Sequence, residues 1–467
     1  MRHQGARPRG GGPGGPGPGG PGPGGPGPGG AGSGGPGPGG RGPGGEPIPL
    51  LWLCGPPGVG KTEVGWELFA RLRRAGVEAG YVDVDQLGIC YPEPAADPGR
   101  HLLQARNVGA VLAGFRAAGA RCVVVSGVVD PAHGVHAGLI PDAALTVCRL
   151  RAGHDELTRR FLGRAGSTVA LADALRNAEA MDAGDLADGC VDTSGLSVAE
   201  VVERVREQTG GWPALPTTEE PSRASFPGLS PASFPGLSPA PSPDLSPGPS
   251  PDLSPDPSPL TSPAPAPVPT PDAGSASAAD GSVLWLCGAT GVGKSTVGFQ
   301  VFRKALGDGR TAAYLDLDQI GFCGPTPADD PRNHRVKSRN LAALWRAYRA
   351  VGARCLTVVG HVEDESVLQA YTDALTPATV TLCRLHAGRE ELTRRILGRG
   401  RGGSWPQPGD LLRGRPAERL LQAADAAVAD DAALERAALG IRVDTDGRTV
   451  EEVAETVATR APWPPLT

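Results

Sequence analysis

Lysine is almost absent from this chain of 467 residues: there are four lysines, against 41 arginines among the 45 basic side chains. So rare a residue draws attention to positions that need a compact ammonium group rather than a planar guanidinium. Two of the four, Lys61 and Lys294, are the second-to-last residues of glycine-rich runs. These runs are Gly-Pro-Pro-Gly-Val-Gly-Lys-Thr at 55–62 and Gly-Ala-Thr-Gly-Val-Gly-Lys-Ser at 288–295. Both runs match the loop that cradles nucleotide phosphates, and each follows an apolar, strand-like run. The sequence therefore predicts binding of nucleoside triphosphates.

Other absences narrow the class of protein. No apolar run reaches membrane-spanning length, and the N-terminus lacks the apolar core of a signal peptide. The net charge of −5 gives no reason to expect nucleic acid or an anionic membrane as a partner. Nine cysteines include no C-x-x-C pair, so we expect small buried hydrophobes rather than metal or redox sites, in a reducing cytoplasm. Six of them lie in strand-like runs: Cys54, Cys122, Cys148, Cys287, Cys355 and Cys383.

Two segments have too few apolar residues to form a core. Residues 1–46 are almost wholly Gly and Pro, and residues 213–281 are rich in Pro, Ser and Ala. Neither can bury enough apolar surface to offset the entropy of ordering its backbone, so both are expected to be disordered. They delimit two globular blocks, residues 47–212 and 282–463, each large enough for its own core.

The two blocks are copies of one unit. Leu-Trp-Leu-Cys-Gly at 51–55 recurs at 284–288, and Asp-x-Asp-Gln at 83–86 recurs at 316–319, both with an offset of 233. Apolar runs alternate with helical patterns in each copy, which indicates a parallel, doubly wound sheet. We therefore expect an α/β fold with two tandem P-loop NTPase domains, each a parallel five-stranded sheet with helices on both faces.

The expected elements of the first block follow from its periodicity. The strands are expected at Pro49–Cys54, Gly80–Val84, Cys122–Val125, Leu145–Arg149 and Val191–Asp192. The helices are expected at Thr62–Ala75, Leu102–Ala118, Asp155–Arg164 and Val198–Glu207. The loops at the carboxyl ends of the strands would then share one crevice.

The phosphate loops define the expected cofactors, ATP and Mg²⁺. Backbone amides and the helix dipole would hold the phosphates, the lysine would reach the β- and γ-phosphates, and Thr62 or Ser295 would ligate magnesium. The expected nucleotide-binding residues are Gly55, Gly58, Gly60, Lys61, Thr62, Gly288, Gly291, Gly293, Lys294, Ser295 and Thr296. Glu63 stands where the second copy has Thr296, and its carboxylate would repel the α-phosphate. Nucleotide binding is therefore expected to be stronger in the second copy.

Paired carboxylates follow the second strand of each copy. They are Asp83 with Asp85 and Asp316 with Asp318. One carboxylate of each pair could accept a proton from a substrate hydroxyl or hold magnesium through water, and the other could hydrogen-bond the acceptor. The alternative is a solvated turn acid or a helix cap. Recurrence one strand away from each phosphate loop favours a function.

Arginines after the fourth strand could stabilise charge on a transferring phosphoryl group from a closing lid. The candidates are Arg159, Arg160, Arg164, Arg394, Arg395 and Arg399. The alternative is a solvated helix face. In the second copy, a longer insertion at 400–419 is interpreted as a flexible lid or substrate loop.

The helix after the second strand begins with recurring polar residues. Arg106 and Arg339 are candidate acceptor-binding residues, next to His101 and His334. They could equally be ordinary polar residues at a helix start.

The third strand of each copy ends without the acidic residue that ring-forming and transporter ATPases need. No Asn-Lys-x-Asp guanine motif occurs in the chain. Together with the early Asp-x-Asp, these absences favour phosphoryl transfer to a small molecule.

Each block resembles the small P-loop kinases, a group that includes shikimate, adenylylsulfate and gluconate kinases and chloramphenicol phosphotransferase. The likeness rests on the phosphate loop, the Asp-x-Asp-Gln at 83–86 and 316–319, the Leu-Thr-Arg-Arg region, and the terminal Val-Asp-Thr. It implies that Asp83 and Asp316 lie near magnesium or act as bases, and that Asp85 and Asp318 face the acceptor. The whole tandem also resembles actinobacterial proteins described as AAA-family or ATP-binding proteins.

The sequence thus favours a magnesium- and ATP-dependent kinase of a small hydroxylated or anionic metabolite. The alternative is an ATP-binding regulatory or scaffold protein, or a nucleotide-hydrolysing switch, in which one or both sites lack kinase activity. The spacer of 69 residues permits the two blocks to pair within the chain.

Overall fold

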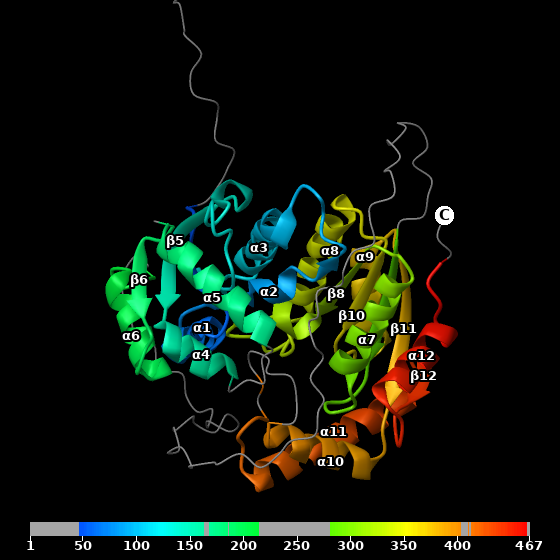
Figure 1. The fold of residues 1–467 in the computed structure, drawn as a ribbon. Coiled ribbons are helices and arrows are strands. Elements are labelled where there is room, and N and C mark those ends of the chain that lie inside the picture. Colours follow the sequence, from blue (N-terminus) through cyan, green and yellow to red (C-terminus); the bar gives the residue numbers. More distant parts are fainter. Residues whose placement is uncertain are drawn as a thin grey trace, which may run out of the picture. The chain divides into compact units, whose positions relative to one another are not determined.

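The computed structural model describes residues 46–162, 168–184, 186–213, 281–402, 410 and 412–464 (Figure 1). Residues 46–213 are called the N-terminal half below, and residues 281–464 the C-terminal half. The segments expected to be disordered lie outside the described residues except at their ends, and Arg164 lies outside them as well.

The N-terminal half alternates strands and helices along the chain. Its strands are β1 (Ile48–Cys54), β2 (Ala79–Asp83), β3 (Cys90–Tyr91), β4 (Cys122–Ser126), β5 (Ala143–Arg151) and β6 (Gly189–Asp192). Its α-helices are α1 (Lys61–Arg74), α2 (Val84–Leu87), α3 (His101–Ala117), α4 (His154–Leu162), α5 (Thr168–Asp182) and α6 (Val198–Gln208).

The C-terminal half repeats the pattern. Its strands are β7 (Ser282–Cys287), β8 (Ala312–Asp316), β9 (Cys323–Gly324), β10 (Cys355–Val359), β11 (Thr379–His386) and β12 (Ile441–Asp444). Its α-helices are α7 (Lys294–Gly307), α8 (His334–Ala350), α9 (Glu365–Leu375), α10 (Arg389–Gly400), α11 (Ala417–Ala437) and α12 (Val450–Arg460). A 3-10 helix at Leu317–Ile320 stands where the N-terminal half has α2.

Every element expected for the first block is present, with ends shifted by no more than two residues. The periodicity did not reveal α2, β3 or α5. Two of these are a single turn and a two-residue strand, too short to show a period. The expected second strand also ends one residue earlier, because Asp83 caps α2 by accepting a hydrogen bond from the amide of Asp85.

Two six-stranded sheets form the framework, in the orders β6-β5-β1-β4-β2-β9 and β12-β11-β7-β10-β8-β3. The expected five-stranded sheet was therefore wrong by one strand. The five strands from one half are parallel, as expected, but the sixth is antiparallel and comes from the other half.

The exchange of edge strands is reciprocal. Gly80 of β2 pairs with Cys323 of β9, and Ala313 of β8 pairs with Cys90 of β3. Each short strand therefore completes the edge of the sheet in the other half. An edge strand otherwise presents unpaired amide and carbonyl groups, so this pairing satisfies groups that would need water or another chain.

Residue alternation along β1 separates the two faces of its sheet. Leu51 and Leu53 pack in a core with α1 and α6, whereas Leu50 and Trp52 point to the opposite face. β7 follows the same rule, with Leu284 and Leu286 on the side of α7 and α12 and Trp285 on the other. Helices therefore cover both faces, as the sequence predicts.

A shared core joins α3 and α8, whose buried side chains belong to one hydrophobic cluster. The hydroxyl of Tyr348 in α8 donates a 2.8 Å hydrogen bond to the carbonyl of Leu87 in the other half. Gly114 of α3 lies directly against Asn340 of α8, and a Cβ there would be 1.7 Å from the Asn340 side-chain oxygen. A side chain at position 114 would therefore displace the Asn340 side chain, which donates to the Ile320 carbonyl.

Among the described residues, no helix is long and apolar enough to cross a membrane. The six cysteines expected to be buried are buried and free of disulfides. Burial raises the pKa of the Cys148 thiol to about 12, which fits the role of a small inert hydrophobe.

Candidate functional site

The two predicted phosphate loops lie between β1 and α1 and between β7 and α7 (Figure 1). Gly60 and Gly293 directly precede these helices with φ angles of 98° and 103°, a left-handed conformation that glycine adopts without steric cost. The loop also runs close to its own sheet, since a Cβ at Gly55 would be 2.3 Å from the carbonyl oxygen of Leu150. The backbone of each loop thus leads into a helix N-terminus that favours an anion.

The ammonium groups of both loop lysines are held by the loop itself. Lys61 Nζ donates to the carbonyls of Gly55 at 2.9 Å and Pro56 at 3.1 Å. Lys294 Nζ makes the matching bonds to Gly288 at 2.9 Å and Ala289 at 3.0 Å. Burial lowers the pKa of both lysines, although nearby aspartates oppose the shift. An incoming phosphate would give each ammonium group an anionic partner in place of neutral carbonyls.

The hydroxyl that follows each lysine bonds to the first aspartate of the Asp-x-Asp motif. Thr62 Oγ1 donates to Asp83 Oδ2 at 2.9 Å. Ser295 Oγ donates to Asp316 Oδ2 at 3.2 Å. Asp83 accepts a further hydrogen bond from the Ser126 hydroxyl at 3.1 Å, for which the C-terminal half has no counterpart because Val359 stands at that position. The structure therefore brings the two motifs together at one point in each half.

These hydroxyl–carboxylate pairs suit magnesium. Mg²⁺ takes oxygen ligands and keeps several waters. One hydroxyl and one carboxylate from the protein are therefore enough when phosphate oxygens of the nucleotide supply further ligands. Among the described residues, no group of three or more His, Cys, Asp and Glu side chains is placed to hold a metal ion by itself. Each pair would offer two oxygen ligands to a magnesium ion.

Asp83 and Asp316 are buried, and burial together with the neighbouring aspartate raises the pKa of each to about 6. The unfolded chain therefore releases this proton near pH 4 and the folded chain near pH 6. Folding stability contributed by each carboxyl group is present at low pH and declines as pH rises through that window. At neutral pH the ionised carboxylate therefore lowers the free energy of unfolding, as is common for functional groups.

We predict that Asp316→Asn stabilises the protein at pH 8 in the absence of nucleotide and metal. A shift of this size corresponds to about 3 kcal/mol, from which lost hydrogen bonds subtract about 1–2 kcal/mol. The thermal midpoint should rise at pH 8 and gain nothing at pH 4, where the wild-type group is protonated. Asp425→Asn is the matched control, because Asp425 is 73% exposed and pairs with the surface side chain of Arg389, so its removal should change stability little. An equal gain at both pH values would contradict the electrostatic cause.

The second aspartate of each motif has different neighbours in the two halves. Asp318 accepts a 2.6 Å hydrogen bond from Lys337 Nζ in α8. Burial alone would raise the pKa of Asp318, but Lys337 and the other nearby cations make the net shift downward. Gln104 stands in the position of Lys337 in the N-terminal half, so Asp85 lacks this particular cation. The sequence singled out both aspartates but not Lys337.

One arginine of each predicted trio is bound to the phosphate loop. Arg160 Nη1 donates to the carbonyl of Val59 at 3.2 Å, and Arg395 Nη1 to that of Val292 at 2.8 Å. Arg395 also bonds Thr445 through both Nη atoms, and Arg160 bonds Thr193 in the same way. These arginines connect the loop to the Val-Asp-Thr turn. The sequence motifs did not predict that the threonine of this turn binds the arginine. The recurrence of Val-Asp-Thr in both halves is the sequence feature that could have indicated it.

The other arginines have different settings. Arg159 and Arg394 are about 70% exposed, at 72% and 70%, and each pairs with a glutamate one turn earlier. Arg399 donates to Asp410 Oδ2 at 2.8 Å, within the segment expected to be a lid. The middle of that segment, residues 403–409 and 411, lies outside the described residues. Roles for these arginines at the nucleotide stay predictions.

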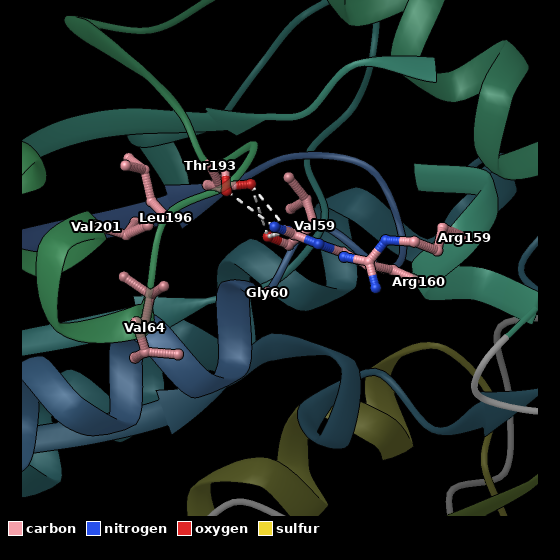
Figure 2. Close-up of a pocket in the computed structure, with 10 residues that line it drawn as sticks. Val59, Gly60, Val64, Arg159, Arg160, Thr193, Leu196 and Val201 are labelled. Atoms are coloured by element: carbon pink, nitrogen blue, oxygen red, sulfur yellow. Dashed lines mark hydrogen bonds between the residues drawn. The ribbon is translucent and has the colours of Figure 1, made fainter. Parts of the chain in front are cut away.

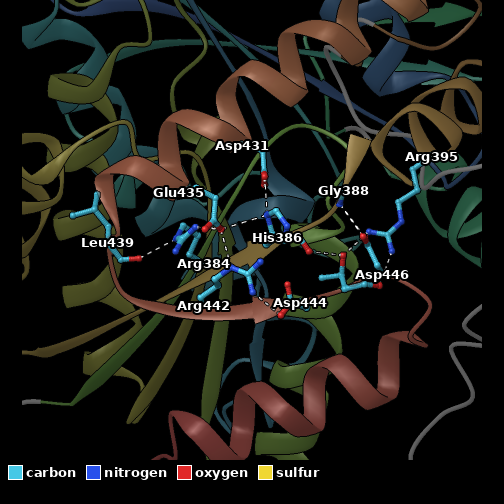
Figure 3. A network of polar contacts seen from close by, with 11 residues as sticks. Arg384, His386, Gly388, Arg395, Asp431, Glu435, Leu439, Arg442, Asp444 and Asp446 are labelled. Carbon is cyan, nitrogen blue, oxygen red and sulfur yellow. Dashed lines mark hydrogen bonds and ion pairs between the residues drawn. The ribbon is translucent and has the colours of Figure 1, made fainter. Parts of the chain in front are cut away.

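The far end of the expected lid leads into α11, which an ionic network fastens to the sheet (Figure 3). His386 at the end of β11 lies 2.7 Å from Asp431 Oδ2, and Arg442 Nε lies 2.8 Å from Glu435 Oε1. Arg384, only 5% exposed, also pairs with Glu435. The segment between α10 and α11 is thus anchored on its C-terminal side.

A cavity of about 340 Å³ opens beside the phosphate loop of the N-terminal half (Figure 2). Its lining combines the loop, the arginines of α4 and an apolar wall: Gly58, Val59, Gly60, Val64, Arg159, Arg160, Thr193, Leu196, Val198 and Val201. An apolar wall with one guanidinium beside it can accommodate a planar aromatic ring.

The predicted acceptor-binding arginines, Arg106 and Arg339, are exposed on α3 and α8. The side of α8 that reaches the Asp-x-Asp motif carries Lys337, and Arg339 lies about 160° around the helix from it. A role for Arg106 and Arg339 in binding acceptor stays a prediction. His334, by contrast, lies in a cluster of polar side chains next to Glu363.

No protein-family model matches this chain, and no curated protein matches it. Solved structures do resemble part of it. They include small-molecule kinases. A gluconokinase from Sinorhizobium meliloti is 15% identical over 39% of this chain and 93% of its own, with a TM-score of 0.26. An APS kinase from Mycobacterium tuberculosis, solved with AMPPNP and APS, is 20% identical over 39% of this chain and 98% of its own, with a TM-score of 0.24.

The tunicamycin resistance protein of Deinococcus radiodurans gives a similar result, with 17% identity over 40% of this chain and 99% of its own and a TM-score of 0.27. Likenesses this partial carry no weight for function.

Proposed function

We propose that this chain binds magnesium–ATP at both loops and that its C-terminal half transfers the γ-phosphoryl group to a hydroxyl of a small molecule. The observation that supports this best is a constellation at the carboxyl ends of β7 and β8. It joins a loop lysine, a loop hydroxyl bonded to the buried Asp316, and a second carboxylate, Asp318, two residues further on. Lys337 bonds this second carboxylate, a contact for which the N-terminal half has Gln104 instead.

Each part of the constellation has a task in this proposal. The loop amides and Lys294 bind the β- and γ-phosphates, and Ser295 with Asp316 holds the magnesium ion. Magnesium, when bound, neutralises charge on the phosphate oxygens. Asp318 faces the acceptor, and Lys337 keeps its carboxylate ionised.

The transfer step is an in-line displacement. The acceptor oxygen forms a bond to the γ-phosphorus while the bond from that phosphorus to the β–γ bridging oxygen breaks. ADP leaves, and the hydroxyl proton passes to a carboxylate of the Asp-x-Asp motif. The products are ADP and a phosphate monoester, and no oxidant or reductant is required.

The cavity of the N-terminal half is proposed to hold the base of a nucleotide. Its apolar wall includes Val64, Leu196 and Val201, and Arg160 borders the cavity where it donates to the Val59 carbonyl of the phosphate loop (Figure 2). Arg448 stands in place of Leu196 in the C-terminal half and bonds the hydroxyl of Thr456 at 2.5 Å. The two halves therefore offer different surroundings to a base.

A second function is proposed for the N-terminal half, namely nucleotide binding without phosphoryl transfer. Gln104 replaces Lys337 there, and Glu63 follows the loop hydroxyl where the C-terminal half has Thr296. This half would then act as a regulatory site for its partner. We place the protein in a reducing cytoplasm, in keeping with its buried free thiols.

The test of kinase function is ADP production from ATP and Mg²⁺ in the presence of a metabolite panel. We expect ADP release by the full chain to rise at least tenfold when the right acceptor is added, because an acceptor-binding site excludes water as the competing nucleophile. Phosphorylated product should form in a 1:1 ratio with ADP. Tight ATP binding with a turnover that no acceptor changes would instead support the regulatory function in both halves.

A further inference from the structure

A polar cluster lies at the end of β10 in the C-terminal half. Val359, the last residue of β10, pairs in register with Leu286 of β7 and with Asp316 of β8. His361 lies two residues beyond this level, as Asp318 and Gly288 do on the two neighbouring strands. Parallel strands end at a common edge, so His361 enters the same crevice as the phosphate loop and the Asp-x-Asp motif.

Three side chains converge there on one carboxylate. Glu363 lies 2.7 Å from Arg332 Nε, 2.8 Å from His334 Nε2 and 3.9 Å from His361 Nε2. The Nδ1 atom of His334 is 3.0 Å from the Tyr371 hydroxyl, and this contact orients the imidazole so that its Nε2 atom faces Glu363. His361 and His334 are 14% and 16% exposed, and Glu363 is 32% exposed. The two imidazoles are therefore mostly buried, whereas Arg332 is 44% exposed, so the cluster has one side that a ligand can reach.

The cations of this edge are already paired with carboxylates. Arg332 is bonded to Glu363 and lies 3.8 Å from Asp430. Lys337 is bonded to Asp318. Lys294 is committed to the phosphates in the proposed function. An anionic acceptor would have to displace these carboxylates, whereas hydroxyl groups can both donate to them and accept from the guanidinium.

The imidazoles reinforce this chemistry. Burial and the nearby Arg332 lower the pKa of His361 to about 4, so its ring is neutral at physiological pH. A neutral imidazole has one donor and one acceptor nitrogen, which suits a hydroxyl group. The end of β10 thus offers planar groups that donate hydrogen bonds and planar groups that accept them, without an excess of positive charge.

The N-terminal half lacks this arrangement. Val128 and Gly99 stand at the positions of His361 and Arg332. Asp130 replaces Glu363 and pairs instead with His133, 3.0 Å away in its own loop. A difference in acceptor chemistry between the two halves is therefore built into the ends of β4 and β10.

We propose that Arg332, His334, His361 and Glu363 bind a neutral polyhydroxylated acceptor, a sugar or polyol, in the C-terminal half. This inference rests on the proposed kinase function and narrows its substrate class. It makes the end of β10 the specificity-determining element, with the phosphate loop and Asp318 on the adjoining strands.

The test compares neutral sugars and polyols with matched acids and amines, for example glucose with gluconate and glucosamine, and glycerol with glycerate. The full chain is assayed with ATP and Mg²⁺, and ATP binding is measured separately by calorimetry. We expect phosphorylated product from neutral members of the panel. His361→Val, which installs the residue of the N-terminal half, should raise KM for the acceptor at least tenfold with a smaller change in kcat and unchanged ATP affinity.

Asp130→Asn in the N-terminal half is the control and should leave KM for the acceptor unchanged. Glu363→Gln, which keeps the shape but removes the charge that holds Arg332 and His334, should raise KM as His361→Val does. A preference for the acids or amines, or an unchanged KM in both C-terminal variants, would overturn the inference while leaving the kinase function intact. ATP binding without product from any panel member would overturn both.

Discussion

Lys294→Met should reduce acceptor phosphorylation by a factor of about 100 to 1,000, the usual loss when one preorganised charge at a developing anion is removed. The ammonium of Lys294 is the buried cation of its loop, bonded to two loop carbonyls that a phosphate would replace. Methionine has a similar length but no charge and no donors. The same change at Lys61 should cost less than tenfold, because the proposed transfer takes place in the C-terminal half.

Initial rates with saturating acceptor measure this difference, and nucleotide affinity of each variant shows which loop has lost its phosphate contact. Lys304→Met is the matched control. Lys304 is 41% exposed near the end of α7, where it pairs with Glu455, and its removal should leave the rate within twofold. Equal losses at Lys61 and Lys294, or a larger loss at Lys61, would refute the division of labour between the halves.

Much of the framework could be predicted because it depends on local patterns. The loop from Gly55 to Gly60 lies between a buried strand and a helix in both the prediction and the structure. The parallel direction of the five strands follows from the alternation of strands and helices along the chain. The contact between Thr62 and Asp83 likewise follows from the topology, since Asp83 ends β2 and Thr62 lies in the first turn of the helix that follows the phosphate loop after β1.

The parts that were missed depend on distant partners. The two-residue strand at Cys90 becomes a strand because Ala313, more than 200 residues away, pairs with it. Lys337 looks like any polar helix residue until α8 places it against Asp318. Thr445 gains its role only when α10 brings Arg395 to it. No local period encodes such contacts.

A protein comprising the C-terminal half alone, residues 281–467, should fail to fold as a soluble monomer. We propose that the two halves are obligate partners, because β8 would lose its antiparallel neighbour β3 and α8 would lose its packing against α3. Exposure of Leu344 and Tyr348, both buried in the shared core, would cost about 1.5–3 kcal/mol for each side chain. That is a large fraction of the stability of a typical domain.

Size-exclusion chromatography and circular dichroism of the separate half measure this outcome, and co-expression of residues 1–213 should restore a folded complex. The matched control is the full chain with a protease site inserted between residues 213 and 281, which should remain one particle after cleavage. A monomeric, cooperatively folded C-terminal half with native ATP affinity would show that the contacts between the halves are dispensable.

The reciprocal edge strands also limit how independently the sequences of the two halves can change. Gly-x-Cys-x-Pro-x-Pro recurs at 88–94 and 321–327, and it contains the strand that each copy lends to the other. A change in this motif alters the sheet of the opposite copy, whereas a change at the end of β4 or β10 alters only its own crevice. Selection can therefore specialise one active site and reduce the other to a regulatory role while both are held to a common frame.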